Sequence, residues 1–232
     1  MLSLGPEDGT PSNNQIALAP SSTAVLKVKG CRQVEILSKT FNALPSLQNV
    51  SLQDIHTVTL HSRLYEARVG NGQSATLSNF DIENVQDLHV KRHTFEGIRI
   101  SGTFGLKSVI VQRTPSLAFA FDSVNEFNVM GGRFDRVSMW GFKLEDCNEF
   151  NALGDSRFFS LASQAFHMKC NKFMLAYNTF DNLQDASLGV TYGVADIQGN
   201  TFEKLTGKPF VDLRPIRETV SVSEASLEMK VD

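Results

Sequence analysis

A pattern of apolar residues that recurs about every 22 residues most constrains how this chain can fold. It is clearest between Cys170 and Phe180, where Cys170, Phe173, Leu175 and Phe180 are the apolar positions. Equivalent segments align on an anchor, defined as the first apolar residue of an apolar-x-apolar pair, and successive anchors are 18 to 30 residues apart. The anchors are Val34, Val58, Leu88, Val109, Phe127, Phe150, Phe173 and Ala195. Internal repeats of this length are typical of solenoids.

The residues around each anchor alternate as in a half-buried β-strand. The second residue after every anchor is apolar, and the seventh is Phe or Tyr in six of the eight segments. A second apolar pair, such as Val50 and Leu52, lies upstream of most segments. Each period therefore holds three short strands and three turns, which is one coil of a parallel β-helix. The predicted fold is all-β: a right-handed parallel β-helix solenoid of about eight coils, about 22 residues each.

The pattern also predicts the domain organisation. Residues 1–23 are rich in Gly, Pro, Ser and Asn and are expected to be a flexible lead-in. The β-helix domain is expected at 24–213, followed by a polar tail at 214–232. The long interval between Val58 and Leu88 predicts a surface loop near residues 68–74. The chain has 17 Phe but only 3 Tyr and 1 Trp, a bias expected where coils stack one side chain upon another.

Composition excludes several classes of protein. A formal charge of −3, 41% hydrophobic and 20% charged residues are ordinary for a folded protein and argue against disorder and charge-driven nucleic-acid binding. No apolar run approaches the roughly 18 residues that span a membrane. The first residues lack the basic and apolar regions of a signal peptide. Cys31, Cys147 and Cys170 have no zinc-site spacing and are expected to be core thiols, and no cofactor or metal is expected.

The segments Gly141–Phe150 and Gln198–Phe202 resemble right-handed parallel β-helix proteins, the pectate-lyase-like solenoids. The similarity is greatest to largely uncharacterised animal β-helix proteins with Phe- and Cys-rich coils. Such relatives are usually secreted or membrane-attached, so the resemblance implies an extracellular location. β-Helix proteins include polysaccharide lyases and hydrolases as well as non-catalytic binding proteins.

The leucine-rich repeat is a second resemblance. Its core pattern is matched by Cys170, Phe173, Leu175, Asn178 and Phe180, and by the equivalent residues around Asn200. Only these two coils carry the Asn that such a repeat uses to bond the backbone of its turn. This alternative implies an interaction protein with one strand per coil and helices on the outer side.

Basic residues follow the anchor strand in most coils. If these turns share one edge, they form a positive stripe suited to an acidic polysaccharide or an extracellular protein partner. A solvated edge that discourages association of strands is the alternative explanation. The candidate ligand-binding residues are Arg63, Arg92, His93, Arg113, Arg133 and Arg157.

Carboxylates lie just before the residue that stands three positions ahead of the anchor in several coils, a position held by Cys, Val or another apolar residue. Asp122 and Glu145 are expected on adjacent coils, near the roughly 5 Å separation of a retaining glycosidase. This pair is the alternative, catalytic site, although no complete catalytic set accompanies it. Asn125, Asn148 and Asn171 are expected to stack as a structural asparagine ladder.

The sequence therefore favours a non-enzymatic solenoid that presents a repetitive surface for recognition or structural assembly. The alternatives are a polysaccharide hydrolase or lyase of pectate-lyase-like fold and a leucine-rich-repeat interaction protein.

Overall fold

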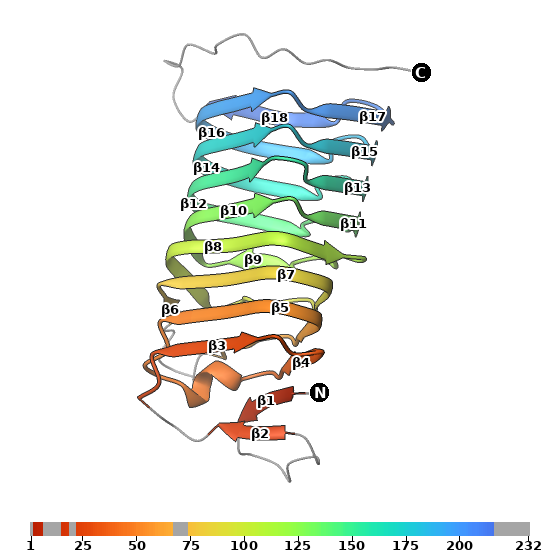
Figure 1. Ribbon diagram of the computed structural model, residues 1–232. Helices are drawn as coiled ribbons and strands as arrows, with labels where there is room; N and C mark the ends of the chain where they lie inside the picture. The colour runs from red at the N-terminus through yellow and green to blue at the C-terminus, as the bar shows by residue number, and fades with distance from the viewer. Residues whose placement is uncertain (1, 7–14, 19–21, 67–73, 216–232) are drawn as a thin grey trace.

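The computed structural model describes residues 2–6, 15–18, 22–66 and 74–215. They form a parallel β-helix in which each coil lies on the one before it (Figure 1). The predicted all-β solenoid of about eight coils is confirmed. Among the described residues the only helical element is the 3-10 helix η1 (Thr40–Ala43), so the three-sided β-helix describes the coils better than the leucine-rich repeat. The loop predicted at 68–74 lies, except for Ser74, outside the described residues.

The described residues form eighteen strands. The N-terminal half contains β1 (Leu2–Pro6), β2 (Gln15–Leu18), β3 (Val25–Lys29), β4 (Gln33–Ile36), β5 (Asn49–Leu60), β6 (Ala75–Leu77), β7 (Asn79–Val90), β8 (Ile98–Val111) and β9 (Phe119–Phe121). The C-terminal half contains β10 (Ser123–Met130), β11 (Arg133–Val137), β12 (Phe142–Leu153), β13 (Arg157–Leu161), β14 (Phe166–Ala176), β15 (Thr179–Leu183), β16 (Leu188–Gln198), β17 (Thr201–Leu205) and β18 (Phe210–Pro215).

One corner of every coil is marked by a column of backbone hydrogen bonds, which we name the turn ladder. Each member of the ladder donates its N–H to the carbonyl of the member on the following coil, at 2.7–3.1 Å. All members except the last have a left-handed φ of 52–62°. The intervals are 22 to 24 residues, with one of 30 that contains the undescribed residues 67–73. The turn ladder comprises Lys39, Arg63, His93, Leu117, Trp140, Gln164, Ala186 and Lys208.

The core consists of three phenylalanine stacks rather than the single stack that the composition implied. In one stack, Phe134, Phe158, Phe180 and Phe202 lie with ring centroids 4.9–5.1 Å apart and planes within 12° of parallel. A second stack runs from Phe119 through Phe142 to Phe166 at 4.9 and 4.7 Å. The third contains Phe80, Phe104, Phe127, Phe150 and Phe173. Each side of the coil thus has its own aromatic column.

The predicted single column of anchors is wrong. Val34, Val58 and Leu88 pair with one another, and each lies five residues before a turn-ladder residue. Phe127 instead stacks on Phe104, and it lies 13 residues before Trp140 of the turn ladder. The two groups therefore occupy different sides of the coil. Apolar alternation is the same on every side, so spacing alone could not reveal the shift, which falls between Leu88 and Phe127.

Two strands lie within the expected lead-in. β1 pairs in parallel with β4, through Leu2 and Val34, and also with β2. Leu4 is buried, and its carbonyl accepts a 2.8 Å hydrogen bond from the N–H of Leu37. β1 therefore caps the N-terminal end of the solenoid by pairing with a strand of the first coil. Solenoid ends require such a cap.

Candidate functional site

The structure divides the six predicted basic residues between separate regions. Arg63 and His93 are consecutive members of the turn ladder, joined by a 2.9 Å backbone hydrogen bond, and Arg92 precedes His93. Arg133 and Arg157 instead lie opposite each other at the start of β11 and β13, on another side of the coil. Figure 1 shows β11, β13, β15 and β17 stacked along that side. A single stripe through all six residues is therefore not formed.

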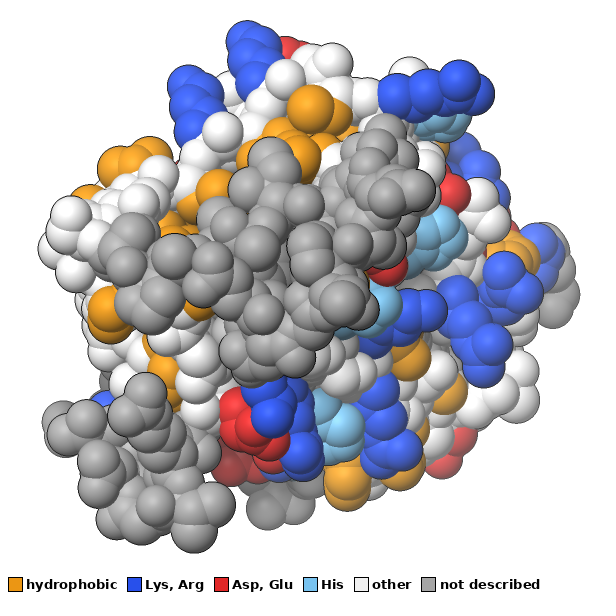
Figure 2. Space-filling view, turned by 90° about the horizontal axis from the view of Figure 1, so that it is seen from below, with side chains coloured by type: hydrophobic (Ala, Val, Ile, Leu, Met, Phe, Trp, Pro, Cys, Tyr) orange, Lys and Arg blue, Asp and Glu red, His pale blue; other side chains and the backbone are white. Residues whose placement is uncertain are grey.

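The turn-ladder group is largely neutralised by a carboxylate. Glu96 Oε2 lies 3.3 Å from Arg63 Nε and 3.3 Å from His93 Nδ1. Lys39 makes a 2.6 Å ion pair with Glu66. Viewed along the solenoid axis from the N-terminal end, Lys, Arg and His side chains are mixed with acidic ones on one flank (Figure 2). Because Lys39, Arg63 and His93 each have an acidic neighbour, an added anion would have to compete for them.

A denser basic surface lies on the outer side of β11 and β13, and we name it the arginine face. It comprises Arg113, Arg133, Arg136 and Arg157, all exposed. Arg133 is paired with Arg157 across neighbouring coils. Thr114 and Val137 form a bridge, so Arg113 and Arg136, which precede them, also lie on neighbouring coils. Four guanidinium groups therefore project from three successive coils.

The arginine face keeps most of its positive charge. Arg133 alone among the four has an ion pair within the described residues, with Asp135 at 3.0 Å. Hydrogen bonding to this carboxylate raises the pKa of Arg133 above its ordinary value. Arg136 Nε donates to the carbonyl of Gln112 at 3.2 Å, which orients that side chain without neutralising it. Four cations and one close carboxylate leave a local excess of positive charge.

Exposed apolar side chains interrupt this charged surface. Phe159, 39% exposed, lies two residues after Arg157 and opposite Asp135 on the neighbouring strand. Ile110, 38% exposed, is opposite Arg133. The face can therefore offer charged hydrogen bonds and apolar contacts to one ligand.

The alternative acidic pair lies in a separate groove of about 290 Å³, which we name the carboxylate groove. Asp122 and Glu145 line it together, as the sequence predicted for adjacent coils. The other lining residues are His93, Glu96, Leu117, Ala120, Phe121 and Lys143. The small side chain of Ala120 lies opposite Lys143 on the next coil and leaves the hollow open.

The carboxylates of this groove already have partners. Glu145 forms a 2.7 Å ion pair with Lys143, and this hydrogen bond holds the pKa of Glu145 below its ordinary value. Asp122 accepts hydrogen bonds from the hydroxyl of Ser74 and from the N–H of Gly97. Trp140, which sequence reasoning passed over, lies beside the groove with Lys143 Nζ 5.7 Å from its ring centre. A general acid of a glycosidase requires a raised pKa, so Glu145 is poorly suited to that role.

The predicted asparagine ladder is formed in part. Asn171 Nδ2 donates to Asn148 Oδ1 at 3.2 Å, and the strand register places Asn125 on the coil below. Further amide pairs join Asn79 to Asn49 and Asn151 to Asn128, both at 2.9 Å. These contacts connect neighbouring coils outside the core, which is a structural role.

Asn178, one of the residues that match the leucine-rich repeat, points into the coil and not outward. It is 2% exposed, and its amide donates to the carbonyls of Ala152 and Ala176 at 2.7 and 3.1 Å. Asn200 repeats the arrangement one coil later, with its amide 2.7 Å from the carbonyl of Leu175. The two matches to the leucine-rich repeat therefore reflect a shared solution: a buried amide that satisfies turn backbone groups.

Cys147 and Cys170 stack on adjacent coils and are buried free thiols, as expected of core thiols, whereas Cys31 is only partly buried. Hydrogen bonding to Cys147, with burial, raises the pKa of the Cys170 thiol. Within the described ranges, no group of three or more His, Cys, Asp or Glu side chains is placed to hold a metal ion. No helix in that part of the chain has the length and apolar character needed to cross a membrane.

Comparison with known proteins gives no family assignment. No protein-family model, no curated protein and no solved structure matches the chain significantly.

Proposed function

We propose that this protein is a non-enzymatic recognition solenoid that binds an acidic polysaccharide on the arginine face. The observation that carries the proposal is the grouping of Arg113, Arg133, Arg136 and Arg157 on three successive coils with one close carboxylate. A folded chain with a formal charge of −3 gains nothing from its overall charge in binding an anion, so any affinity must come from such a local excess.

The chemistry of the face fits a charged sugar polymer. Guanidinium groups bind carboxylates and sulfates through paired hydrogen bonds, which suits uronic acids and sulfated sugars. Strands of a parallel sheet are about 4.8 Å apart, so charges on successive coils form a short, regular array. Phe159 provides an aromatic surface beside this array, where the C–H face of a sugar ring can pack. The extracellular location implied by the β-helix resemblance is compatible with this ligand class.

Charge reversal tests the proposal. Polygalacturonate, heparin and neutral dextran are immobilised, and the affinity of the wild-type protein is compared with that of the Arg113→Glu, Arg133→Glu, Arg157→Glu variant. The matched control reverses three exposed cations elsewhere, at Arg32, Arg99 and Lys169, and so has the same net charge. We expect binding to an acidic polymer, weakened by salt, that falls at least tenfold in the first variant only. No acidic-glycan binding, or equal losses in the two variants, contradicts the proposal.

A polysaccharide hydrolase or lyase, as in pectate-lyase-like enzymes, is the second candidate function. The meeting of Asp122 and Glu145 in the carboxylate groove is the observation that favours it. Turnover of pectic or uronic substrates that is lost in the Asp122→Asn, Glu145→Gln variant and kept in the arginine-face variant would establish it. Absence of turnover in the wild-type protein removes it.

A further inference from the structure

A polar hollow of about 220 Å³ lies at one end of the arginine face, and we name it the polar notch. It opens on the outer side of β11, β13 and β15, which stack on successive coils along one side of the solenoid (Figure 1). Arg136 belongs both to the arginine face and to the lining of the notch. The polar lining residues are Arg136, Ser138, Ser160, Asn182 and Gln184.

A β-bulge in each of these strands turns one polar side chain outward. The strand pairing of β11, β13 and β15 skips Arg136, Ser160 and Asn182. All three residues have a left-handed φ of 48–58°. An extra, unpaired residue of this kind changes the direction of its side chain relative to the alternation of the strand. The bulges therefore place a guanidinium group, a hydroxyl group and an amide group in one column across three coils.

The notch is open because the middle coil has small side chains. Ser160 and Ala162 line it from that coil. Larger side chains flank them, from Arg136 on the preceding coil and from Asn182 and Gln184 on the following coil. The notch is therefore a gap between longer polar side chains, on the same sheet face as the arginines.

The polar groups of the notch have unused hydrogen-bonding capacity. Asn182 Nδ2 donates to Ser160 Oγ at 2.9 Å, which leaves the amide oxygen of Asn182 and the hydroxyl proton of Ser160 available. Arg136 donates from Nε to the carbonyl of Gln112, and its terminal nitrogens have no partner among the described residues. The hydroxyl of Ser138 likewise has no hydrogen bond within the described part of the chain.

This set of groups favours a neutral, hydroxyl-bearing ligand. The amide oxygen of Asn182 needs a donor from the ligand, which a sugar hydroxyl or an N-acetyl N–H provides and a carboxylate or sulfate does not. Arg133 and Arg157 are donors only, so they favour acidic groups. Arg133 lies three residues before Arg136 on β11, roughly 10 Å along the strand. Acidic and neutral groups are therefore preferred at neighbouring places on one surface.

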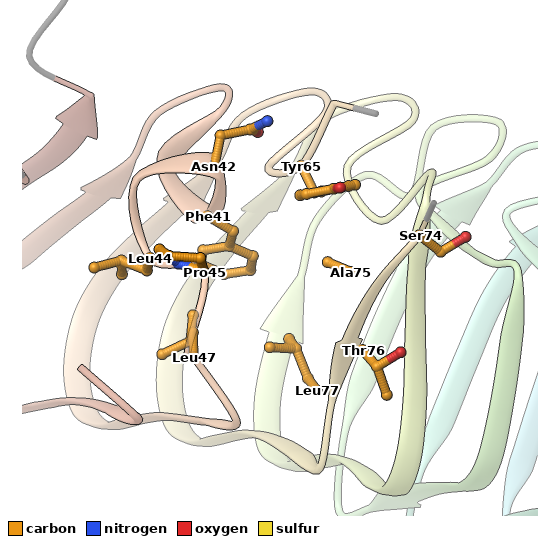
Figure 3. Close-up of a pocket in the computed structure, with 10 residues that line it drawn as sticks. All are labelled: Phe41, Asn42, Leu44, Pro45, Leu47, Tyr65, Ser74, Ala75, Thr76 and Leu77. Carbon is orange, nitrogen blue, oxygen red and sulfur yellow. The ribbon is translucent and has the colours of Figure 1, made fainter. Parts of the chain in front are cut away.

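The larger hollow of the molecule has a different chemistry. It measures about 600 Å³ and lies near the N-terminal end, with Leu44, Leu47 and Leu77 among its walls (Figure 3). None of its lining residues in the described part of the chain is charged. It therefore does not extend the charged surface, whereas the polar notch adjoins the arginine face directly.

From this arrangement we propose that the arginine face and the polar notch together select a polysaccharide in which acidic and neutral sugars alternate. An acidic sugar binds Arg133 and Arg157, and the neutral sugar next to it places a hydroxyl or N-acetyl group in the notch. Phe159, between Arg157 and Ser160 on β13, packs against a sugar ring. A polymer of uronic acid alone would bring carboxylate oxygens against the amide oxygen of Asn182. The inference rests on the proposed function and adds to it the order of the sugar units.

Two oligosaccharides of equal length test the proposal. In an oligogalacturonate every sugar is acidic, whereas in a hyaluronan oligosaccharide glucuronic acid alternates with N-acetylglucosamine. The affinity of the full chain for each is measured by isothermal titration calorimetry at one salt concentration. We expect the hyaluronan oligosaccharide to bind at least fivefold more tightly, although it carries half as many carboxylates. Attraction by charge alone would give the opposite order.

Three protein variants locate this preference in the notch. Ala162→Leu fills the notch and should weaken hyaluronan binding at least tenfold, with less than a twofold effect on oligogalacturonate. Thr206→Leu is the matched control, because Thr206 is exposed at the equivalent position two coils later, outside the notch, and it should change neither affinity. Ser138→Ala removes one hydroxyl and should weaken hyaluronan binding about threefold, which keeps the test valid if Ala162→Leu fails to fold.

The outcomes separate this proposal from the polysaccharide proposal. Equal or tighter binding of oligogalacturonate to the wild-type protein overturns the alternating order and leaves the arginine face as a polysaccharide site. Equal losses of hyaluronan affinity in Ala162→Leu and Thr206→Leu overturn the role of the notch. Binding of neither oligosaccharide overturns the alternating order as well, and a heparin oligosaccharide then shows whether the polysaccharide proposal stands.

Discussion

Replacement of Phe180 by alanine tests the stacked core that shapes every surface described above. The Phe180 ring is fully buried and lies between Phe158 and Phe202, with ring centroids 4.9 and 5.0 Å away and planes within 12° of parallel. Removing a buried Phe side chain costs about 3–5 kcal/mol, and losing two ring–ring contacts favours the upper part of that range. The free energy of unfolding is thus expected to fall by about 4–5 kcal/mol.

The control for this substitution is on a neighbouring strand. Phe159 is 39% exposed on the outer side of β13, next to the buried Phe158, so Phe159→Ala should cost less than about 1 kcal/mol. Thermal unfolding followed by circular dichroism should show a Tm roughly 8–20 °C lower for Phe180→Ala, given a chain of this size. Equal Tm values for the two variants, or no change for Phe180→Ala, would refute the stacking of coils through these rings.

Three further outcomes follow from single side chains. Asn178→Ala leaves buried turn carbonyls without donors and should lower the free energy of unfolding, measured with denaturant, by about 2–3 kcal/mol. Asn171→Ala, on the exposed ladder, should lower it by less than about 1 kcal/mol. Equal losses in the two variants would contradict the structural role of the buried amide. Burial, and then the charge of Glu83, raise the pKa of Asp81, so its ionisation disfavours the folded state. Asp81→Asn should therefore raise Tm at pH 7, and this increase in Tm should vanish as the pH falls below the ordinary Asp pKa of 3.8. An increase in Tm that persists in acid would contradict its origin in the ionisation of Asp81. Because Cys170 is buried and its pKa is raised, iodoacetamide should label it at neutral pH only after unfolding. The partly exposed Cys31 should react in the folded protein. Rapid labelling of Cys170 in the folded protein would contradict the packing.

The architecture could be predicted from the sequence because solenoid coils repeat their apolar positions. The column of Phe134, Phe180 and Phe202 and the pairing of Cys147 with Cys170 follow directly from spacing. The side of the coil on which Val58 and Leu88 lie could not be predicted, because each side shows the same alternation. The anchors change position between Leu88 and Phe127, because Val109 pairs with Val85 and Phe127 pairs with Phe104.

The candidate sites were predictable only in part, for a related reason. Spacing brought Arg133 and Arg157 together, and it placed Asp122 and Glu145 on adjacent coils. Spacing did not identify Arg136. Its backbone is left-handed, with φ 48°, and this turns the Arg136 side chain outward although strand alternation would point it inward.

The most direct test of the polysaccharide proposal observes the guanidinium groups themselves. A ¹⁵N-labelled sample is titrated with an oligogalacturonate or a heparin-derived hexasaccharide, and the arginine Nε–Hε signals are assigned and followed. We predict that signals of Arg113, Arg133, Arg136 and Arg157 shift with one common affinity, while those of Arg32 and Arg99 do not. Absence of any shift, or equal shifts at all six arginines, would contradict a specific binding surface on this side of the solenoid.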